Sequence, residues 1–119
     1  MVHYLILQKV ISIIEEIRHE KVTIDYVARQ VGFSSVHLQR LFKEQYDITL
    51  AAYIRSRKLQ LAADEVIHTD KKIDEIGYDL EFGHESSFIR SFRREFGMTP
   101  NEMRRHAREA MPVQVNIVA

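Results

Sequence analysis

Apolar residues recur at intervals of three and four along most of the chain, and this spacing predicts α-helices. The first helix is expected from Leu5 to Arg18, with one apolar face made of Leu7, Val10, Ile11, Ile14 and Ile17. Six more are expected at about residues 24–31, 35–46, 50–67, 73–80, 85–96 and 100–109. The alternation typical of a strand occurs only in the tail, over residues 111–118. The pattern therefore predicts an all-α fold of about seven helices.

Residues that favour helix ends lie at these expected boundaries. Thr23, Ser34 and Thr49 each carry a side-chain oxygen that can cap the first turn of the helix that follows. Gly97 is placed as a C-cap glycine. Residues 99–102, Thr-Pro-Asn-Glu, have the form of a capping box with proline at the first helical position.

The chain repeats itself after residue 23. At an offset of 49 the matching residues are Ile24, Asp25, Val27, Ala28, Val31 and Phe33 with Ile73, Asp74, Ile76, Gly77, Leu80 and Phe82. At an offset of 50 they are Leu38, Arg40, Phe42, Lys43, Tyr46, Thr49 and Arg55 with Phe88, Arg90, Phe92, Arg93, Phe96, Thr99 and Arg105. The one inserted residue falls in a turn between two helices, where insertions are tolerated.

The first copy has the spacing of a helix-turn-helix unit. Ala28 is small enough for two helices to approach closely, and Gly32 can adopt the left-handed backbone that a tight turn requires. Leu38 then faces the core from the second helix. An ordinary helical hairpin with a glycine turn would fit this single copy equally well.

The second copy favours the helix-turn-helix interpretation. Gly77 and Phe88 hold the equivalent core positions, whereas Glu81 stands in place of the turn glycine. Gly83, two residues further on, is the candidate for supplying the left-handed backbone instead. We expect subdomains at residues 1–58 and 59–110, joined by a long central helix.

Side chains that the core does not use form a polar and basic stripe on the second helix of each unit. The candidates for reading bases are Ser35, Val36, Gln39 and Arg40 in the first unit and Glu85, Ser86, Ser87 and Arg90 in the second. Glutamine can pair with adenine and arginine with guanine, valine can touch the thymine methyl group, and glutamate can accept from cytosine. The candidates for phosphate contacts are Lys43, Arg55, Arg57, Lys58, Arg93, Arg94 and Thr99.

The net charge is zero, but the charges are segregated. Residues 34–58 carry five basic and two acidic groups, and residues 84–108 carry six and three, whereas residues 59–83 carry two and seven. Attraction to phosphate falls off over about 8–10 Å in physiological salt, so local charge matters more than the total. The two basic segments favour double-stranded DNA as the partner, although solvated helix faces would give a similar pattern.

The sequence resembles the DNA-binding domain of the AraC/XylS family over about residues 5–108. The resemblance rests on Gly32-Phe33-Ser34, on residues 37–43 and 53–59, and on Phe96-Gly97-Met98-Thr99-Pro100 followed by Arg104 and Arg105. It implies a homeodomain-like fold and a monomeric transcription activator that recruits RNA polymerase. It also implies base reading by Gln39, Arg40 and Arg90. The layout is nearest to the short activators of the MarA type, which carry a tryptophan where this chain has Val36. Glu81 stands where a glycine is usual. The lack of cysteine fits a cytoplasmic location.

Other functions are disfavoured by what the sequence lacks. It has no cysteine, and its six histidines lack the spacing of a zinc protease site. No phosphate-binding loop or nucleophile elbow is present, so we expect neither an enzyme nor a cofactor. No apolar run approaches the roughly 20 residues of a membrane span. A protein-binding adaptor would need an apolar stripe where these stripes are polar.

The tail, residues 111–119, leaves two interpretations open. It is either a frayed end or the beginning of a second domain, such as the small-molecule sensor that some relatives carry after the DNA-binding part.

Overall fold

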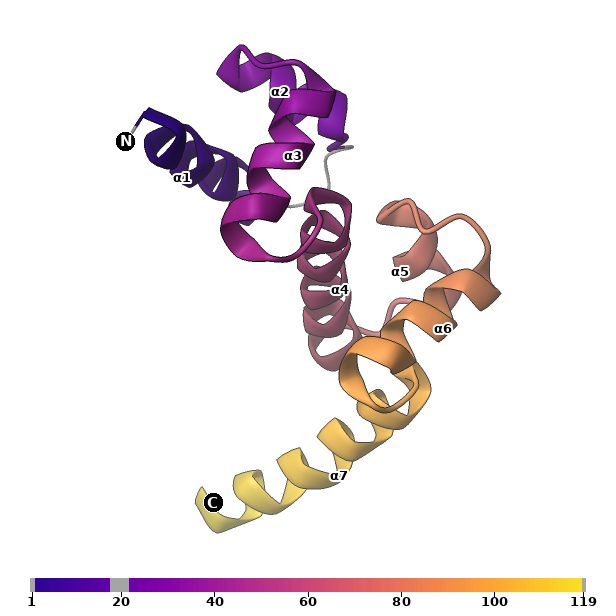
Figure 1. The fold of residues 1–119 in the computed structure, drawn as a ribbon. Coiled ribbons are helices and arrows are strands. Elements are labelled where there is room, and N and C mark those ends of the chain that lie inside the picture. Colours follow the sequence, from indigo (N-terminus) through magenta and orange to yellow (C-terminus); the bar gives the residue numbers. More distant parts are fainter. Residues whose placement is uncertain (1, 18–21, 119) are drawn as a thin grey trace. The chain divides into compact units, whose positions relative to one another are not determined.

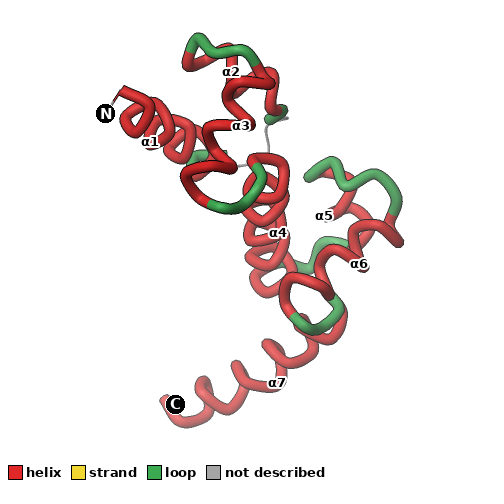
Figure 2. The backbone as a smooth tube through the Cα atoms, in the orientation of Figure 1, coloured by secondary structure: helices red, strands yellow, loops and turns green. Residues whose placement is uncertain are grey.

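The computed structural model describes residues 2–17 and 22–118, with side chains at residues 3–17 and 22–110. Figure 1 shows the helices in chain order, which are α1 (Val2–Glu15), α2 (Ile24–Val31), α3 (Ser35–Tyr46), α4 (Leu50–His68), α5 (Ile73–Asp79), α6 (Glu85–Phe96) and α7 (Pro100–Val118). Short loops join them, and the described residues contain no strand (Figure 2). The predicted all-α class is therefore confirmed. None of the described helices combines the length and apolar character needed to cross a bilayer.

The chain divides into two compact units. Unit 1 is Met1–Lys58 and unit 2 is Leu59–Ala119. The division falls inside α4, which therefore contributes its first part to unit 1 and its last part to unit 2.

The helix ends follow the predicted caps in unit 1. The Thr23 hydroxyl accepts a hydrogen bond from the backbone N–H of Tyr26 at 3.0 Å, and Ser34 accepts from that of His37 at 3.2 Å. The Thr49 hydroxyl accepts from Ala52 at 3.1 Å, so α4 begins as predicted. Each of these bonds satisfies one of the orphan N–H groups of a helix start.

The predicted bounds of two helices are wrong. α1 begins at Val2 and ends at Glu15, earlier at both ends than predicted, and Arg18 lies outside the described residues. α7 continues to Val118, so the strand-like interpretation of the tail is also wrong. A lone strand would leave its backbone groups unpaired, whereas a helix pairs them within the segment.

Each unit has its own apolar core. In unit 1 the fully buried side chains from the four helices include Val10, Ile14, Val27, Leu38, Phe42 and Leu50. In unit 2 the buried cluster is Leu59, Ala62, Ala63, Val66, Ile76, Leu80, Phe88 and Phe92. Because these positions follow the three-and-four spacing, the remaining positions of α3 and α6 face outward.

The internal repeat is visible in the geometry of both units. The Phe42–Tyr46 rings lie 4.8 Å apart at 54°, and the equivalent Phe92–Phe96 rings lie 4.7 Å apart at 54°. The repeat also reaches beyond the predicted segments, since buried Ile17 and Val66 are 49 residues apart. α1 therefore corresponds to the second half of α4, and the first half of α4 corresponds to α7.

The two turns have the same backbone but different residues. The N–H of Phe33 bonds to the carbonyl of Ala28 and that of Phe82 to the carbonyl of Gly77, both at 3.0 Å. Gly32 has φ 74° and its equivalent Glu81 has φ 62°, so both are left-handed. The suggestion that Gly83 takes over this role is wrong: Gly83 (φ 79°) is the inserted residue, and Glu81 itself makes the turn.

Candidate nucleic-acid interface

α3 presents the predicted stripe of unit 1 to solvent. Its buried residues, Leu38 and Phe42, fix the rotation of the helix, so Val36, Gln39 and Arg40 lie on the exposed side. Val36 is 77% exposed, which is unusual for a β-branched apolar side chain and leaves its methyl groups free for contact with a partner. The Gln39 side-chain N–H₂ donates to the backbone carbonyl of Ser35 at 3.2 Å.

The other α3 candidates already have partners within unit 1. The Ser35 hydroxyl is half-buried and donates to Asp25 of α2, which ties the starts of the two helices together. Arg40 lies 4.0 Å from Glu44, one turn further along. Lys43 lies 3.7 Å from the carboxylate of Asp47 and also donates to its carbonyl at 3.3 Å. These surface ion pairs are weak enough to open when a ligand competes for the cation.

α6 presents the corresponding stripe of unit 2. Phe88 and Phe92 are buried, Ser87 is half-buried, and the exposed candidates are Glu85, Ser86, Arg90, Arg93 and Arg94. Among the residues that the structure describes, no acidic side chain lies within ion-pair distance of the three arginines, although the charge of Arg93 acts on the Glu102 carboxylate. Their charge is therefore available to an anionic ligand.

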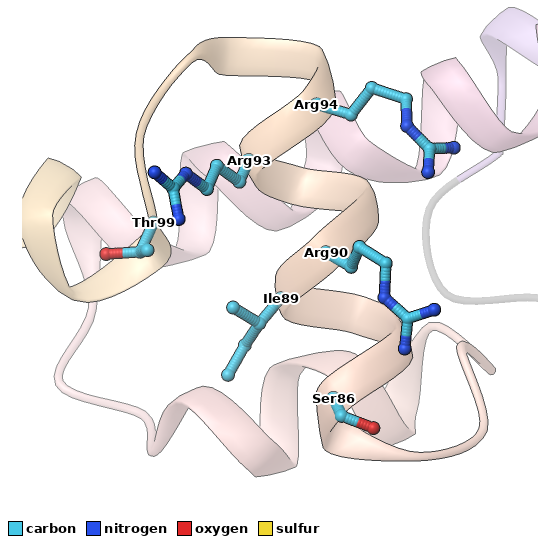
Figure 3. Close-up of a pocket in the computed structure, with 6 residues that line it drawn as sticks. All are labelled: Ser86, Ile89, Arg90, Arg93, Arg94 and Thr99. Carbon is cyan, nitrogen blue, oxygen red and sulfur yellow. The ribbon is translucent and has the colours of Figure 1, made fainter.

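A surface pocket of about 660 Å³ lies against α6 (Figure 3). It is lined by Ser86, Ile89, Arg90, Arg93, Arg94 and Thr99. Arg90 and Arg94 extend to one side of the helix, and Arg93 extends to the other, toward Thr99 (Figure 3). Ile89 was not among the predicted site residues. The signal was available, because Ile89 stands 50 residues after Gln39 and so occupies the equivalent position.

Thr99 forms the predicted capping box at the start of α7. Its hydroxyl accepts from the N–H of Glu102 at 3.2 Å, and its own N–H donates to the Glu102 carboxylate at 2.8 Å. Hydrogen bonds from the backbone N–H and the side chain of Thr99 to the Glu102 carboxylate, together with the charges of Arg93 and Arg105, lower the pKa of Glu102 and keep it ionised. Glu102 thus engages both the hydroxyl and the backbone N–H of Thr99.

The three basic residues of α4 are not equivalent. Arg55 is exposed and Lys58 half-buried, whereas the Arg57 side chain is only 17% exposed. Arg57 donates to the carbonyl of Glu15 at 2.9 Å and lies 3.9 Å from the Glu15 carboxylate. The structure therefore places Arg55 and Lys58 where a phosphate could reach them and directs Arg57 toward the end of α1.

The predicted candidates thus form one set in each unit. In the described part of the chain, no three histidine or acidic side chains gather as a metal ion would require. What the two sets share is an outward, polar helix face with guanidinium, amide and hydroxyl groups. Such a face suits the edges of base pairs and the phosphates beside them.

Comparison with known proteins agrees with this geometry. Residues 27–106 match the family described as "Helix-turn-helix domain". The chain is 41% identical over 104 residues to the regulatory protein SoxS of Salmonella typhimurium, covering 87% of this chain and 97% of SoxS.

Solved structures have a similar fold. A transcriptional regulator of the AraC-type DNA-binding class from Chromobacterium violaceum superimposes with a TM-score of 0.78 at 29% identity, covering 87% of this chain and 93% of that one. The DNA-binding domain of AdpA, solved in complex with a target DNA, gives a TM-score of 0.76 at 21% identity, covering 89% and 96%. At that identity the likeness to AdpA shows the fold alone.

Proposed function

Because this chain belongs to the AraC/XylS family of helix-turn-helix transcription regulators, we propose that α3 and α6 enter the major groove of one specific double-stranded DNA site. The observation that carries the proposal is the outward stripe of each helix, which combines base-reading side chains with cations. For a protein with this role we expect a cytoplasmic location and no catalytic activity.

The roles within α3 follow from chemistry and position. The N-terminal part of a recognition helix is the part that reaches base edges. We assign Val36 to a thymine methyl group, Gln39 to adenine and Arg40 to guanine. Lys43, one turn further along, is assigned to phosphate. Ser35 is assigned a supporting role, because its hydroxyl is engaged by Asp25.

α6 and α4 supply the remaining contacts. Arg90, the equivalent of Arg40, is assigned to guanine, and Glu85, Ser86 and Ser87 to neighbouring base edges. Arg93, Arg94, Thr99, Arg55 and Lys58 are assigned to phosphates. We assign Arg57 to holding α1 instead, because Glu15 already binds its guanidinium.

We propose that a monomer binds an asymmetric site of about two helical turns. Adjacent major grooves on one face of DNA lie about 34–36 Å apart. α4 has 19 residues, which corresponds to a length of about 28 Å. A shared helix of this length is compatible with placing the two base-reading helices, α3 and α6, about one DNA turn apart. A second copy of the chain would then not be needed.

Substitutions in α3 test the base-reading role. Arg40→Ala is expected to cost about 1–3 kcal/mol on the preferred duplex and to relax the preference at one base pair. Lys43→Ala is expected to weaken binding to all duplexes alike. Fluorescence anisotropy with the preferred duplex and its single-base variants measures both. An equal loss on every duplex for Arg40→Ala would contradict base reading by this residue.

We further propose that the protein activates transcription through contact with RNA polymerase on the acidic face of α5. This face consists of Asp74, Glu75 and Asp79 with Tyr78, which is 77% exposed. A pocket of about 370 Å³ lies beside it. Negative charge here repels DNA, and an exposed aromatic ring is typical of protein contact sites.

A double substitution separates activation from DNA binding. Asp74→Asn with Glu75→Gln is expected to lower transcription from a target promoter severalfold while duplex affinity stays within about twofold, because local charge on this face does not contact phosphate. Asp64→Asn, an exposed acid on α4, is the matched control. Unchanged transcription in the double variant would contradict this surface as the contact.

A further inference from the structure

We propose that the two units divide the work on DNA: α3 supplies most of the sequence discrimination, and α6 with its arginine-lined pocket anchors the sugar-phosphate backbone. The inference rests on the proposed function and adds which unit does what. It comes from comparing the two helices position by position at the offset of 50 residues.

The positions nearest the N-termini differ in how well they discriminate bases. Val36 and Gln39 of α3 correspond to Ser86 and Ile89 of α6. Glutamine pairs with both major-groove atoms of adenine, whereas serine bonds to several bases without strong preference. Ile89 is half-buried and packs against the core of unit 2, so less of it can reach a base. At these two positions α6 therefore discriminates bases less well than α3, although it keeps Arg90 and carries Glu85.

The positions one turn further along differ in charge. Lys43 and Glu44 of α3 correspond to Arg93 and Arg94 of α6. Glu44 lies 4.0 Å from Arg40, so α3 partly neutralises its own cations. At the equivalent position α6 carries Arg94, and among the described residues neither Arg93 nor Arg94 has an acidic partner within ion-pair distance. α6 thus attracts phosphate more strongly than α3 does.

The pocket beside α6 brings these positive charges together on one surface. It is lined by all three arginines: Arg90 and Arg94 extend to one side of α6, and Arg93 extends to the other side, toward Thr99 (Figure 3). A phosphodiester oxygen there would meet guanidinium donors. The carboxylate of Glu102 opposes an anion, but it is bonded to Thr99 and shares the field of Arg93 and Arg105.

The two roles have different signatures in solution. A backbone contact releases counterions and makes binding depend on salt, whereas a base contact changes the ratio of affinities between duplexes. Each phosphate contact contributes about 0.9 to the slope of log affinity against log salt. The slope and the ratio can therefore be assigned to the two helices separately.

The experiment measures duplex binding by the full chain over a range of salt, on its selected site and on a scrambled duplex of equal length. Arg93→Gln with Arg94→Gln is expected to reduce the slope by about two on both duplexes and leave their affinity ratio unchanged. Val36→Ser with Gln39→Ile, which gives α3 the residues of α6, is expected to reduce the ratio roughly tenfold or more and leave the slope unchanged. Arg108→Gln, whose exposed side chain binds Asp70 of the same unit, is the control for charge alone.

The outcomes separate this inference from the proposed function. The proposed difference between the helices would be overturned if the ratio of affinities for the two duplexes fell in the α6 variant, or if the salt slope fell only in the α3 variant. DNA binding itself would not be contradicted by either result. No duplex binding by the unsubstituted chain would overturn the proposed function and the difference between the helices with it. Thermal unfolding of each variant confirms that the substituted chains are folded.

Discussion

Two pairs of equivalent positions have a left-handed backbone, and in each pair only one unit has glycine. The first pair is Gly32 (φ 74°) and Glu81 (φ 62°), and the second is Asp47 (φ 58°) and Gly97 (φ 78°). Aspartate tolerates this conformation better than other residues with a Cβ, because its short side chain bonds locally. Glu81 is thus the most strained of the four.

Glu81→Gly is expected to raise the free energy of unfolding of unit 2 by about 1 kcal/mol, since glycine removes the steric cost of positive φ. Asp47→Gly, the matched change in unit 1, is expected to raise it by less. Urea unfolding of both variants measures the difference. A loss of stability in Glu81→Gly would show that contacts of the glutamate side chain outweigh the strain.

Gly77 is needed for the close approach of α5 and α6. A Cβ atom built there would lie 2.7 Å from the ring of Phe88, although its equivalent Ala28 packs without difficulty in unit 1. Gly77→Ala is therefore expected to cost about 1–3 kcal/mol of stability through overpacking.

The repeat supplies a compensating variant for this test. Adding Phe88→Leu to Gly77→Ala recreates the Ala28–Leu38 pair of unit 1 and is expected to recover part of the loss, as measured by urea unfolding. A double variant less stable than the sum of the two single changes would contradict steric conflict as the cause.

The helices of the two units are capped unequally. Thr23 and Ser34 cap α2 and α3 with side-chain bonds, whereas the equivalent residues before α5 and α6, Lys72 and His84, make none. The first turns of α5 and α6 must therefore be satisfied by solvent or packing, which favours easier local opening in unit 2.

His84→Ser is expected to stabilise unit 2 by about 1 kcal/mol, because serine can accept from the first turn of α6 as Ser34 does in α3. Hydrogen exchange of the α6 amides should slow correspondingly. The reverse change, Ser34→His, should accelerate exchange in α3. Equal exchange before and after both changes would rule out capping as the difference between the units.

In each unit an arginine side chain donates to backbone carbonyls near the end of a helix. Arg57 donates to the carbonyls of Glu15 and Ile17 at 2.9 and 3.5 Å, and Arg104 donates to that of Val66 at 3.0 Å. Ile17 and Val66 are equivalent positions, 49 residues apart, at or just beyond the end of a helix. A cation there satisfies orphan carbonyls and suits the negative end of the helix dipole.

Burial and a hydrogen bond to Glu15 raise the pKa of Tyr53, which lies near Arg57, to about 12.

Arg104→Ala is expected to cost about 1–3 kcal/mol, because it removes a charged donor from a half-buried carbonyl. Arg108→Ala is the control on the same helix, since its pair with Asp70 is exposed and worth at most about 1 kcal/mol. Thermal unfolding compares the two. Equal shifts in melting temperature would contradict a stabilising role for the bond from Arg104 to the Val66 carbonyl.

Most elements were predictable because their ends are local. The caps at Thr23 and Ser34, the C-cap at Gly97 and the capping box at Thr99 all depend on residues within one turn. The end of α7 was not predictable in this way, since alternation over a short segment fits a strand and a helix alike. The left-handed backbone at Glu81 was missed because residue preference alone places glycine, not glutamate, at a positive φ.

At the level of the whole molecule, the stripes of α3 and α6 were predictable and their partners were not. The stripe follows from excluding core positions, which the helical period identifies. The bond of Arg57 to Glu15 and that of Ser35 to Asp25 join different helices, and no local pattern marks them. The pocket beside α6 likewise depends on how α7 begins at Thr99.

The repeated unit is the basis of the proposed DNA reading. Equivalent positions in α3 and α6 face outward from equivalent cores, and α4 belongs to both units. One chain would therefore contact DNA twice, with unequal residues at each contact. This predicts an asymmetric site with two blocks of unequal sharpness.

Selection of bound sites from random duplex DNA, at about physiological salt, tests this prediction. The expected result is one asymmetric motif whose two blocks lie about one helical turn, roughly 10–10.5 base pairs, apart. One block should be sharply defined and the other more degenerate. No enriched motif, together with weak binding that does not change with salt, would contradict sequence-specific DNA recognition by this protein.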